Sequence, residues 1–302
     1  MRIAYLILAH NTPNHMARLV RALNSPNAAF FIHVDRKSDL SPFTREIPHD
    51  NTTFITDRIA VYWGDSSIVK ATLKLIERAL GDPRDFEYLV LLSASDYPLK
   101  DPQYIEEFFS RHRGCEFISL AQMPCEAVGK PIERLENFWL RTRLSSQFGV
   151  RVIGLLNRWN TRLGLIRRDY VKALKDITPY AGSQWWALTA DACRQIVAFV
   201  QSNRGVVSYF DNVFAPDESL FHTIIGNSEF AKHVTRSLTF TDWSRPTPKP
   251  AIIDIDHLNA FVKMERITAD DPYGRGELLF ARKFPDDSSE LTKFIDVHII
   301  NR

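Results

Sequence analysis

An acidic pair at the start of an expected helix offers the clearest catalytic chemistry in this sequence of 302 residues. Asp217 and Glu218 follow Pro216, and apolar residues then recur at helical spacing up to Ile225. The pattern predicts that Asp217 caps an α-helix and that Glu218 lies in its first turn. Backbone N–H groups and the helix dipole keep a carboxylate ionised there, as a general base requires. Because Asp-Glu is also an ordinary way to start a helix, the catalytic interpretation needs support from the rest of the chain.

Three apolar runs that end in polar residues predict the strands that would position a site. The runs cover residues 2–10, 29–35 and 88–92, and His10, Asp35 and Asp96 lie at or just beyond their ends. Amphipathic helices are expected after the first run and after residues 61–66. Continuous apolar strands that alternate with helices indicate a mostly parallel α/β sheet. Ligands of such sheets bind beyond the carboxyl ends of the strands.

Six short segments occur in a fixed order along the chain. They are IHVDRKS (32–38), VYWG (61–64), YLVLLSASDYPLK (88–100), GSQWWAL (182–188), APDE (215–218) and FARKF (280–284). Together they resemble the core-2/I-branching β-1,6-N-acetylglucosaminyltransferase family (glycosyltransferase family 14), which also contains the peptide O-xylosyltransferases. The last segment looks closer to the xylosyltransferase branch. The resemblance implies a GT-A-type glycosyltransferase fold and a UDP-sugar donor.

Basic residues near the C-terminus are expected to bind the diphosphate of that donor. The resemblance implies transfer without a metal, in which Arg282 and Lys283 do the electrostatic work and a second basic residue comes from the loop 243–250. Arg245 and Lys249 both suit this role, and we slightly favour Lys249. A guanidinium offers phosphate a planar fork and an ammonium offers a point charge. Such charges stabilise a leaving diphosphate as it becomes more negative, although each residue could instead be a surface charge.

Few carboxylates could bind a divalent metal. Many nucleotide-sugar transferases hold a metal on an Asp-x-Asp motif at a strand end, where this chain offers only Asp96. The one literal Asp-x-Asp consists of Asp254 and Asp256, and its neighbours indicate a strand edge that leads into a capped helix. We therefore expect no metal site and no cofactor besides the UDP-sugar, which is a substrate.

The donor nucleoside is expected at the ends of the first strands. By resemblance, Asp35 contacts the uridine, and the backbone at His10 lines the base pocket. Asp96 approaches the donor sugar or ribose, and with Pro98 it also makes a tight turn. His10 and His33 could instead be strand-end residues that bond to nearby backbone.

Aromatic residues are the candidates for the acceptor. Trp185 and Trp186 are adjacent on an expected strand, so their side chains point to opposite faces. We expect one to pack inward and the other to stack against a sugar ring, although both could be core residues. Trp243 and Asp217 are further candidates for acceptor binding.

Composition bounds the remaining possibilities. The length suits one catalytic domain over residues 1–302, with a nucleotide-sugar half (1–125), a basic helical insertion (126–180) and an acceptor and catalytic half (181–302). A net charge of +2 gives no electrostatic case for nucleic acid. The three cysteines, at 115, 125 and 193, have no Cys-x-x-Cys spacing, which favours unpaired thiols in a reducing compartment and gives no support for zinc. Without a leader or an apolar run of roughly 20 residues, we expect a cytoplasmic, bacterial enzyme.

The segment 134–175 differs in composition from the rest of the chain. It has ten basic residues and two acidic ones, interleaved with apolar and aromatic residues. Such a stretch suits an anionic membrane surface or a soluble anionic saccharide. It could equally be a solvated basic face whose apolar residues lie in the core. The basic residues are Arg134, Arg141, Arg143, Arg151, Arg158, Arg162, Arg167, Arg168, Lys172 and Lys175.

The expected reaction is one in-line displacement. An acceptor hydroxyl attacks the anomeric carbon opposite the diphosphate, Glu218 accepts the proton, and the α-linked donor gives a β-linked product. The transferred sugar could be GlcNAc, xylose or another, and the acceptor a saccharide, such as a bacterial polysaccharide or its lipid-linked precursor. The main alternative is a catalytically inactive nucleotide- or glycan-binding protein of the same fold, and a second is a retaining enzyme or hydrolase.

Overall fold

The computed structural model describes residues 1–47, 50–141, 147–245 and 249–300, with all side chains there except those of Gln147, Phe148 and Val150. Arg143 and the loop residues 246–248 therefore lie outside the described residues. The strands are β1 (Ile3–Ala9), β2 (Ala28–Val34), β3 (Thr52–Phe54), β4 (Tyr88–Ser93), β5 (Asp96–Pro98), β6 (Glu116–Ile118), β7 (Ala121–Gln122), β8 (Tyr180–Ala181), β9 (Trp186–Thr189), β10 (Val234–Thr235), β11 (Thr239–Thr241), β12 (Thr268–Asp271), β13 (Gly274–Glu277) and β14 (Phe280–Arg282).

Helices flank these strands on both sides. They are α1 (Pro13–Ala22), α2 (Ser41–Glu46), α3 (Ser67–Leu80), α4 (Pro102–Arg111), α5 (Glu133–Glu136), α6 (Gln147–Leu163), α7 (Tyr170–Leu174), α8 (Ala190–Ser202), α9 (Arg204–Phe210), α10 (Leu220–Gly226), α11 (Ile255–Val262) and α12 (Ser289–Ile295). Short helical turns are η1 (Glu126–Val128), η2 (Pro216–Glu218), η3 (Glu229–His233) and η4 (Asp296–Ile300).

The central sheet has seven strands in the order β10-β6-β9-β4-β1-β2-β3. The pairs β1–β2, β1–β4, β2–β3 and β10–β6 are parallel, while β9 runs antiparallel to both β4 and β6. The expectation of an α/β fold with a mostly parallel sheet is thus confirmed, and the three expected apolar strands are β1, β2 and β4. Strands of this sheet come from both sides of the expected insertion.

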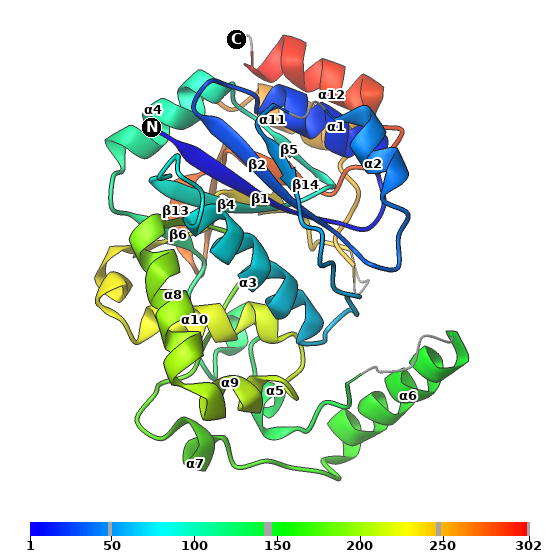
Figure 1. Cartoon of the computed structure of the whole chain (residues 1–302), viewed down its shortest axis with the longest axis vertical. Helices are drawn as coiled ribbons and strands as arrows, with labels where there is room; N and C mark the ends of the chain where they lie inside the picture. Colours follow the sequence, from blue (N-terminus) through cyan, green and yellow to red (C-terminus); the bar gives the residue numbers. More distant parts are fainter. Residues whose placement is uncertain (48–49, 142–146, 246–248, 301–302) are drawn as a thin grey trace.

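Alternate residues of β1 belong to two different cores. Ala4 and Leu6 pack in one cluster with residues of α3 and α8, whereas Tyr5 and Ile7 pack in a second cluster with residues of α1 and α4. Figure 1 shows α3 and α8 on one side of the sheet and α1 on the other. A strand covered on both faces must be apolar at every position, which explains the continuous apolar run.

A second sheet, in the order β11-β14-β5, carries the C-terminal basic residues. β14 pairs antiparallel with β5, and the register places Arg282 opposite Asp96 and Ala281 opposite Tyr97. Opposite residues of an antiparallel pair have neighbouring side chains. The sheet therefore brings residues that are far apart in sequence to one point beyond the end of β4.

The structure corrects the expected start of the helix at Glu218. Pro216–Glu218 form the short turn η2, Ala215 before it has a φ of 49°, and α10 begins only at Leu220. Asp217 is therefore not the N-cap of an α-helix, and Glu218 does not lie in the first turn of α10. Proline at position 216 and the left-handed residue before it favour a separate tight turn.

Two other helix starts differ in how they are capped. Thr12 occupies the N-cap position of α1, but its side chain makes no capping hydrogen bond. Asp254 caps α11 together with His257, so the helix that we expected after the literal Asp-x-Asp is confirmed. Residues 251–253 before it are not a strand.

None of the described residues of helix α6 belongs to a buried hydrophobic cluster. Figure 1 shows the helix standing away from the central sheet. Among the residues described, no helix has the length and apolar character required to cross a membrane.

Candidate active site

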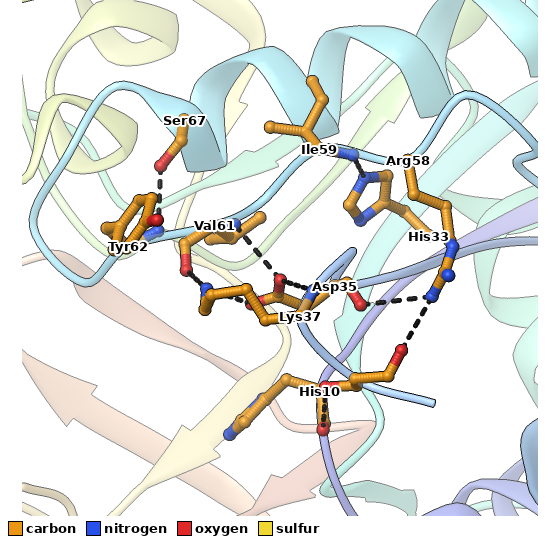
Figure 2. A network of polar contacts seen from close by, with 10 residues as sticks. His10, His33, Asp35, Lys37, Arg58, Ile59, Val61, Tyr62 and Ser67 are labelled. Carbon is orange, nitrogen blue, oxygen red and sulfur yellow. Dashed lines mark hydrogen bonds and ion pairs between the residues drawn. The ribbon is translucent and has the colours of Figure 1, made fainter. Parts of the chain in front are cut away.

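Asp35 lies at the end of β2 in a dense polar network (Figure 2). Its carboxylate accepts hydrogen bonds from the Lys37 ammonium at 2.7 Å, from the backbone of Lys37 at 2.9 Å and from the backbone of Val61 at 3.3 Å. Lys37 also donates to the carbonyl of Val61 and lies 4.4 Å from the centre of the Tyr62 ring. The network joins the ends of the first strands to the loop before α3, where a nucleoside was predicted.

The two strand-end histidines have different surroundings. His33 is buried and accepts a hydrogen bond on Nε2 from the backbone of Ile59 at 2.9 Å, and burial lowers its pKa. His33 thus bonds to nearby backbone, as the alternative interpretation held. His10 is exposed, and its backbone carbonyl accepts from the Ser38 hydroxyl at 2.7 Å. Partial burial, and then the charge of Lys283, lowers the pKa of His10.

A cavity of about 370 Å³ opens beside this network. Cationic side chains dominate its lining, which includes Arg36, Arg58, Lys70 and Arg141 together with Tyr62 and Asp65. A larger cavity of about 860 Å³ lies among α4, β6, β10 and β13 and includes none of the predicted site residues. The lining of the smaller cavity also contains none of the predicted site residues, but it shares Arg58, Ile59, Tyr62 and Ser67 with the polar network around Asp35.

Arg282 is held by two buried partners. Its Nε lies 3.2 Å from Oδ1 of Asp96, and its guanidinium carbon lies 4.0 Å from the centre of the Trp185 ring. Asp96 is fully buried, and it accepts hydrogen bonds from the hydroxyl of Ser93 at 2.5 Å and from the backbone of Ser93 at 3.0 Å. Burial raises the pKa of Asp96 even though Arg282 lies against it. Asp96 therefore orients Arg282 in this structure, and its predicted approach to the donor sugar stays a prediction.

Lys283 extends the cationic group beyond Arg282. Burial, followed by the charges of Arg282 and Lys249, lowers the pKa of Lys283. Arg245 instead lies 3.5 Å from Asp254 at the start of α11. Of the two predicted loop residues, Lys249 is thus the one that lies within electrostatic reach of Lys283.

A buried histidine supports this group from behind. His15 of α1 bonds through Nδ1 to the Ser288 hydroxyl at 2.6 Å and through Nε2 to the backbone carbonyl of Asp96 at 2.9 Å. Its ring stacks on Phe284 with centres 5.3 Å apart. Burial lowers the pKa of His15 to about 4, so the ring is neutral at pH 7.

Glu218 is paired with two cations from the predicted insertion. Its Oε2 accepts from the ammonium of Lys130 at 2.5 Å and from the guanidinium of Arg134 at 2.7 Å. Burial acts to raise the pKa of Glu218, but these two charges outweigh it and hold the pKa below its usual value. Both bonds use Oε2, and Oε1 has no hydrogen-bond partner among the described residues. The carboxylate is thus ionised at pH 7, and one of its oxygens stays without a hydrogen bond among the described residues.

Asp217 next to it behaves in the opposite way. Its side chain is buried, and burial together with the negative charge of Glu218 raises its pKa to about 7. The two neighbouring carboxyl groups therefore differ in charge. Glu218, the less buried one, is ionised at pH 7, whereas the pKa of Asp217 is raised.

The segment 182–185 connects Glu218 with Arg282. The backbone N–H of Gly182 donates to the carbonyl of Glu218 at 2.9 Å, and Trp185 lies under the Arg282 guanidinium. His222 of α10 holds the middle of the segment, where its Nε2 bonds to the Ser183 carbonyl at 2.9 Å. Burial lowers the pKa of His222 to about 3, which leaves the Nε2–H of a neutral ring as the donor.

The expectation that Trp185 or Trp186 presents an open face is wrong. Trp185 is 5% exposed and Trp186 is 2% exposed, and both belong to the same core. Trp185 precedes β9 and packs against Arg282, while Trp186 packs against Phe221 with ring centres 6.2 Å apart. Neither side chain is open to a ligand, because helix α10 covers Trp186 and the second sheet covers Trp185.

An aromatic group that adjoins the ion pair of Glu218 includes one exposed tryptophan. Trp63 is 76% exposed and packs edge-on against Phe214, which in turn contacts Trp139. The guanidinium of Arg134 lies 5.4 Å from the Phe214 ring, so this aromatic group adjoins the ion pair with Glu218. Trp243, which follows β11, is exposed as well, and its contact with an acceptor stays a prediction.

Three residues beside Glu218 escaped the sequence analysis as site residues. Lys130 carries no local signal, and Arg134 was seen only as part of a basic stretch. Tyr273 lies in the turn between β12 and β13, and burial followed by the charge of Glu218 raises its pKa. Arg236 fixes this turn through Asp271 at 3.1 Å and the carbonyl of Gly274 at 3.2 Å. The sequence does contain a signal for Tyr273, because an aromatic residue between Pro272 and Gly274 indicates an exposed turn that can hold a site residue.

Known proteins resemble this chain in sequence. A xylosyltransferase of Ciona intestinalis is 25% identical over 253 residues, which cover 81% of this chain and 27% of that protein. The xylosyltransferase oxt of Drosophila pseudoobscura pseudoobscura is 26% identical over 259 residues and human xylosyltransferase 2 over 257, with 81% of this chain covered in each case. The chain spans about a quarter of the length of these relatives (26% and 27%, respectively).

One solved structure and one family of enzymes also resemble this chain. A Bacillus anthracis crystal structure in complex with sucrose, provisionally named a glucose-1-phosphate thymidylyltransferase, aligns over 67% of this chain and 78% of that one. With a TM-score of 0.29 and an identity of 14%, this likeness is too weak to indicate a shared fold or function. The sequence model of the Core-2/I-branching enzyme family matches residues 3–264. Because this match spans most of the chain, the protein belongs to the Core-2/I-branching enzyme family of glycosyltransferases.

Proposed function

We propose that this protein is an inverting transferase that moves a sugar, such as xylose or GlcNAc, from a UDP-sugar to a hydroxyl of a saccharide acceptor. The observation that carries the proposal is the pairing of two units on the segment 182–185. One unit is the ionised carboxylate of Glu218, and the other is the cationic group of Arg282 and Lys283. A base and a group that stabilises a leaving anion are what a single displacement requires.

Glu218 is the proposed general base. Its Oε1 would accept the proton of the acceptor hydroxyl as the oxygen attacks the anomeric carbon, while Lys130 and Arg134 keep Oε2 fixed. Attack opposite the departing diphosphate turns an α-linked donor into a β-linked product. Only one carboxylate acts in this step, unlike the pair that glycoside hydrolysis uses.

The cationic group is proposed to stabilise the departing UDP. Arg282 can offer phosphate oxygens its planar fork, and Lys283 and Lys249 add positive charge beside it. Asp96, Trp185 and His15 hold this arrangement before the substrate arrives, so little reorganisation accompanies the reaction. We propose that these cations make an obligatory metal unnecessary and that the uridine lies by Asp35.

The replacement Glu218→Gln tests the base. The amide keeps the size of the side chain but cannot accept a proton, so transfer should fall by about 10²–10⁴-fold while the affinity for UDP stays the same. Transfer is measured as UDP release from a panel of UDP-sugars with saccharide acceptors. Glu229→Gln, an exposed glutamate beyond α10, is the matched control and should keep full activity. Full turnover by Glu218→Gln, or an α-linked product by NMR, would contradict the mechanism.

Calorimetry of UDP binding tests the donor site. Binding should survive EDTA, and Lys283→Met should weaken it by about 10–100-fold because a charge-assisted contact is lost. Lys263→Met, an exposed lysine at the end of α11, should bind UDP like the unmodified protein. Binding that requires manganese would overturn the metal-independent site, and failure to bind any nucleotide would favour an inactive glycan-binding protein.

A further inference from the structure

Helix α6 attaches to the protein through a polar side. The Asn157 amide accepts from the backbone of Leu140 at 2.7 Å and donates back to its carbonyl at 2.9 Å. Asn160 donates to the carbonyl of Phe138 at 2.8 Å and accepts from the backbone of Ile166 at 2.7 Å. Both asparagines are buried. The inner side of the helix therefore carries two amides that bond to neighbouring backbone.

The outer side of α6 is apolar and exposed. Trp159 is 57% exposed and Leu155 is 53% exposed, and Val152, Leu156 and Leu163 are exposed beside them. At 100° per residue these five positions occupy a single face about 100° wide. Leu165 and Ile166 continue the exposed apolar surface beyond the helix. This outcome contradicts the interpretation in which these apolar residues belong to the core.

Three arginines line one edge of that face. Arg151, Arg158 and Arg162 fall on the helical positions next to Leu155, and all three are exposed. No acidic residue occurs within residues 147–163. In the part of the chain that the structure describes, none of the three has an ion-pair partner. Apolar surface and unpaired positive charge are thus combined on one side of a helix of 17 residues.

We propose that the outer face of α6 binds the surface of an anionic lipid bilayer. The indole and the leucines would lie at the boundary between headgroups and acyl chains, and the arginines would contact lipid phosphates. A second copy of the chain fits less well, because the facing helix would bring no acidic residue to pair with the arginines. A soluble anionic saccharide would satisfy the arginines but would leave the apolar face open to water.

The residues at 139 and 140, to which α6 is attached through Asn157, adjoin the candidate active site. Trp139 bonds through its backbone to the carbonyl of Asn212 at 2.8 Å and packs against Phe214 with ring centres 4.5 Å apart. Phe214 contacts Arg134, which pairs with Glu218. A bilayer that holds α6 would therefore lie near the side of the protein on which Glu218 is reached. Membrane binding by α6 does not depend on whether the protein catalyses the proposed reaction.

Vesicle co-sedimentation tests this proposal. The purified chain should sediment with vesicles of equal parts phosphatidylcholine and phosphatidylglycerol, and hardly with phosphatidylcholine alone. The triple variant R151Q/R158Q/R162Q should bind the mixed vesicles roughly 100-fold more weakly, since each cation near an anionic surface contributes to binding. The triple variant L155Q/L156Q/W159Q should lose binding by more than about 100-fold because its apolar face is removed.

Matched variants separate the face from general effects. V297Q removes an exposed apolar side chain elsewhere, and R78Q/R204Q/K232Q removes three exposed cations elsewhere, so both should bind vesicles normally. Circular dichroism and UDP calorimetry show whether each α6 variant is folded with its donor site intact. Failure of the unmodified chain to bind vesicles, or equal binding to both kinds, would overturn the proposal. So would a dimer in sedimentation analysis that L155Q/L156Q/W159Q abolishes, because the face would then belong to a second copy.

Discussion

At the scale of a single residue, Glu218 has unusual surroundings for the general base that we propose it to be, because two cations hold one of its oxygens. A base with a lowered pKa is fully ionised at pH 7 but accepts a proton less readily than one whose pKa lies near the working pH. The ion pairs offset this disadvantage, because they fix the Glu218 rotamer and direct Oε1 away from Lys130 and Arg134. Asp217, with its pKa raised to about 7, is the protonated neighbour over most of the acidic range.

The pH dependence of catalysis should report this ion pair. Lys130→Gln removes a positive charge from beside Glu218, so the pKa of the carboxylate must rise towards its ordinary value or above. Because the base acts only when ionised, the acidic limb of kcat/KM should move to higher pH. Activity measured across the acidic range checks the shift, with Lys172→Gln in α7 as the exposed control. An acidic limb that stays in place would show that another group sets it.

At the scale of elements, the segment before β9 determines whether the two halves of the site meet. Gly182 touches Ser119 so closely that a Cβ would lie 1.6 Å from the Ser119 carbonyl oxygen and 2.9 Å from Cδ2 of His222. Only glycine fits such an approach of two backbones. The close contact places the Gly182 N–H on Glu218 and leads the chain to Trp185 beneath Arg282.

Gly182→Ala should therefore damage both stability and catalysis. The added methyl group forces the segment away from Ser119, which we expect to cost about 3 kcal/mol of unfolding free energy by analogy with overpacked cores. Transfer should fall more than UDP affinity, because Glu218 is displaced directly. Urea unfolding and the UDP-release assay measure the two effects. Gly154→Ala in α6, where a Cβ meets nothing within 4 Å, should be neutral or stabilising by about 1 kcal/mol.

For the whole molecule, two buried neutral histidines set a limit in acid. The pKa of His222 is lowered to about 3 and that of His15 to about 4, while an unfolded histidine titrates near 6.5. Between pH 6.5 and 4 the unfolded chain binds protons that the folded protein refuses, so stability falls as the pH falls. Each histidine should account for a loss of ~3 kcal/mol by pH 4. Asp217 acts with the opposite sign, since its raised pKa favours the folded state in acid.

Thermal unfolding as a function of pH measures this balance. His222→Gln keeps a donor for the Ser183 carbonyl but cannot take up a proton, so its Tm should fall less steeply from pH 6.5 to 4 than that of the unmodified protein. His233→Gln, which changes an exposed histidine, should leave the slope unaltered. Equal slopes for all three proteins would assign acid unfolding to other groups.

The sequence by itself determined the local elements and the family. Apolar runs predicted β1, β2 and β4, because strands covered on both faces leave a signal that needs no partner to be seen. The acidic segment at Glu218 and the basic segment at Arg282 and Lys283 were found in the same way, as short residue patterns. The helix α11 was also expected from its neighbours along the chain, whereas the strand expected before it is absent and Asp254 is instead the N-cap of the helix.

Only the tertiary structure decided which side chains meet and which surfaces stay open. Lys130 and Arg134 reach Glu218 across 88 and 84 residues of chain, a contact that no local pattern encodes. Trp185 and Trp186 were both buried by elements distant in sequence. The periodicity of α6 marked an apolar face but not what covers it, because a helix shows the same 3.6-residue pattern whether that face meets a core or solvent. The two asparagines that turn it outward act through backbone groups outside the helix.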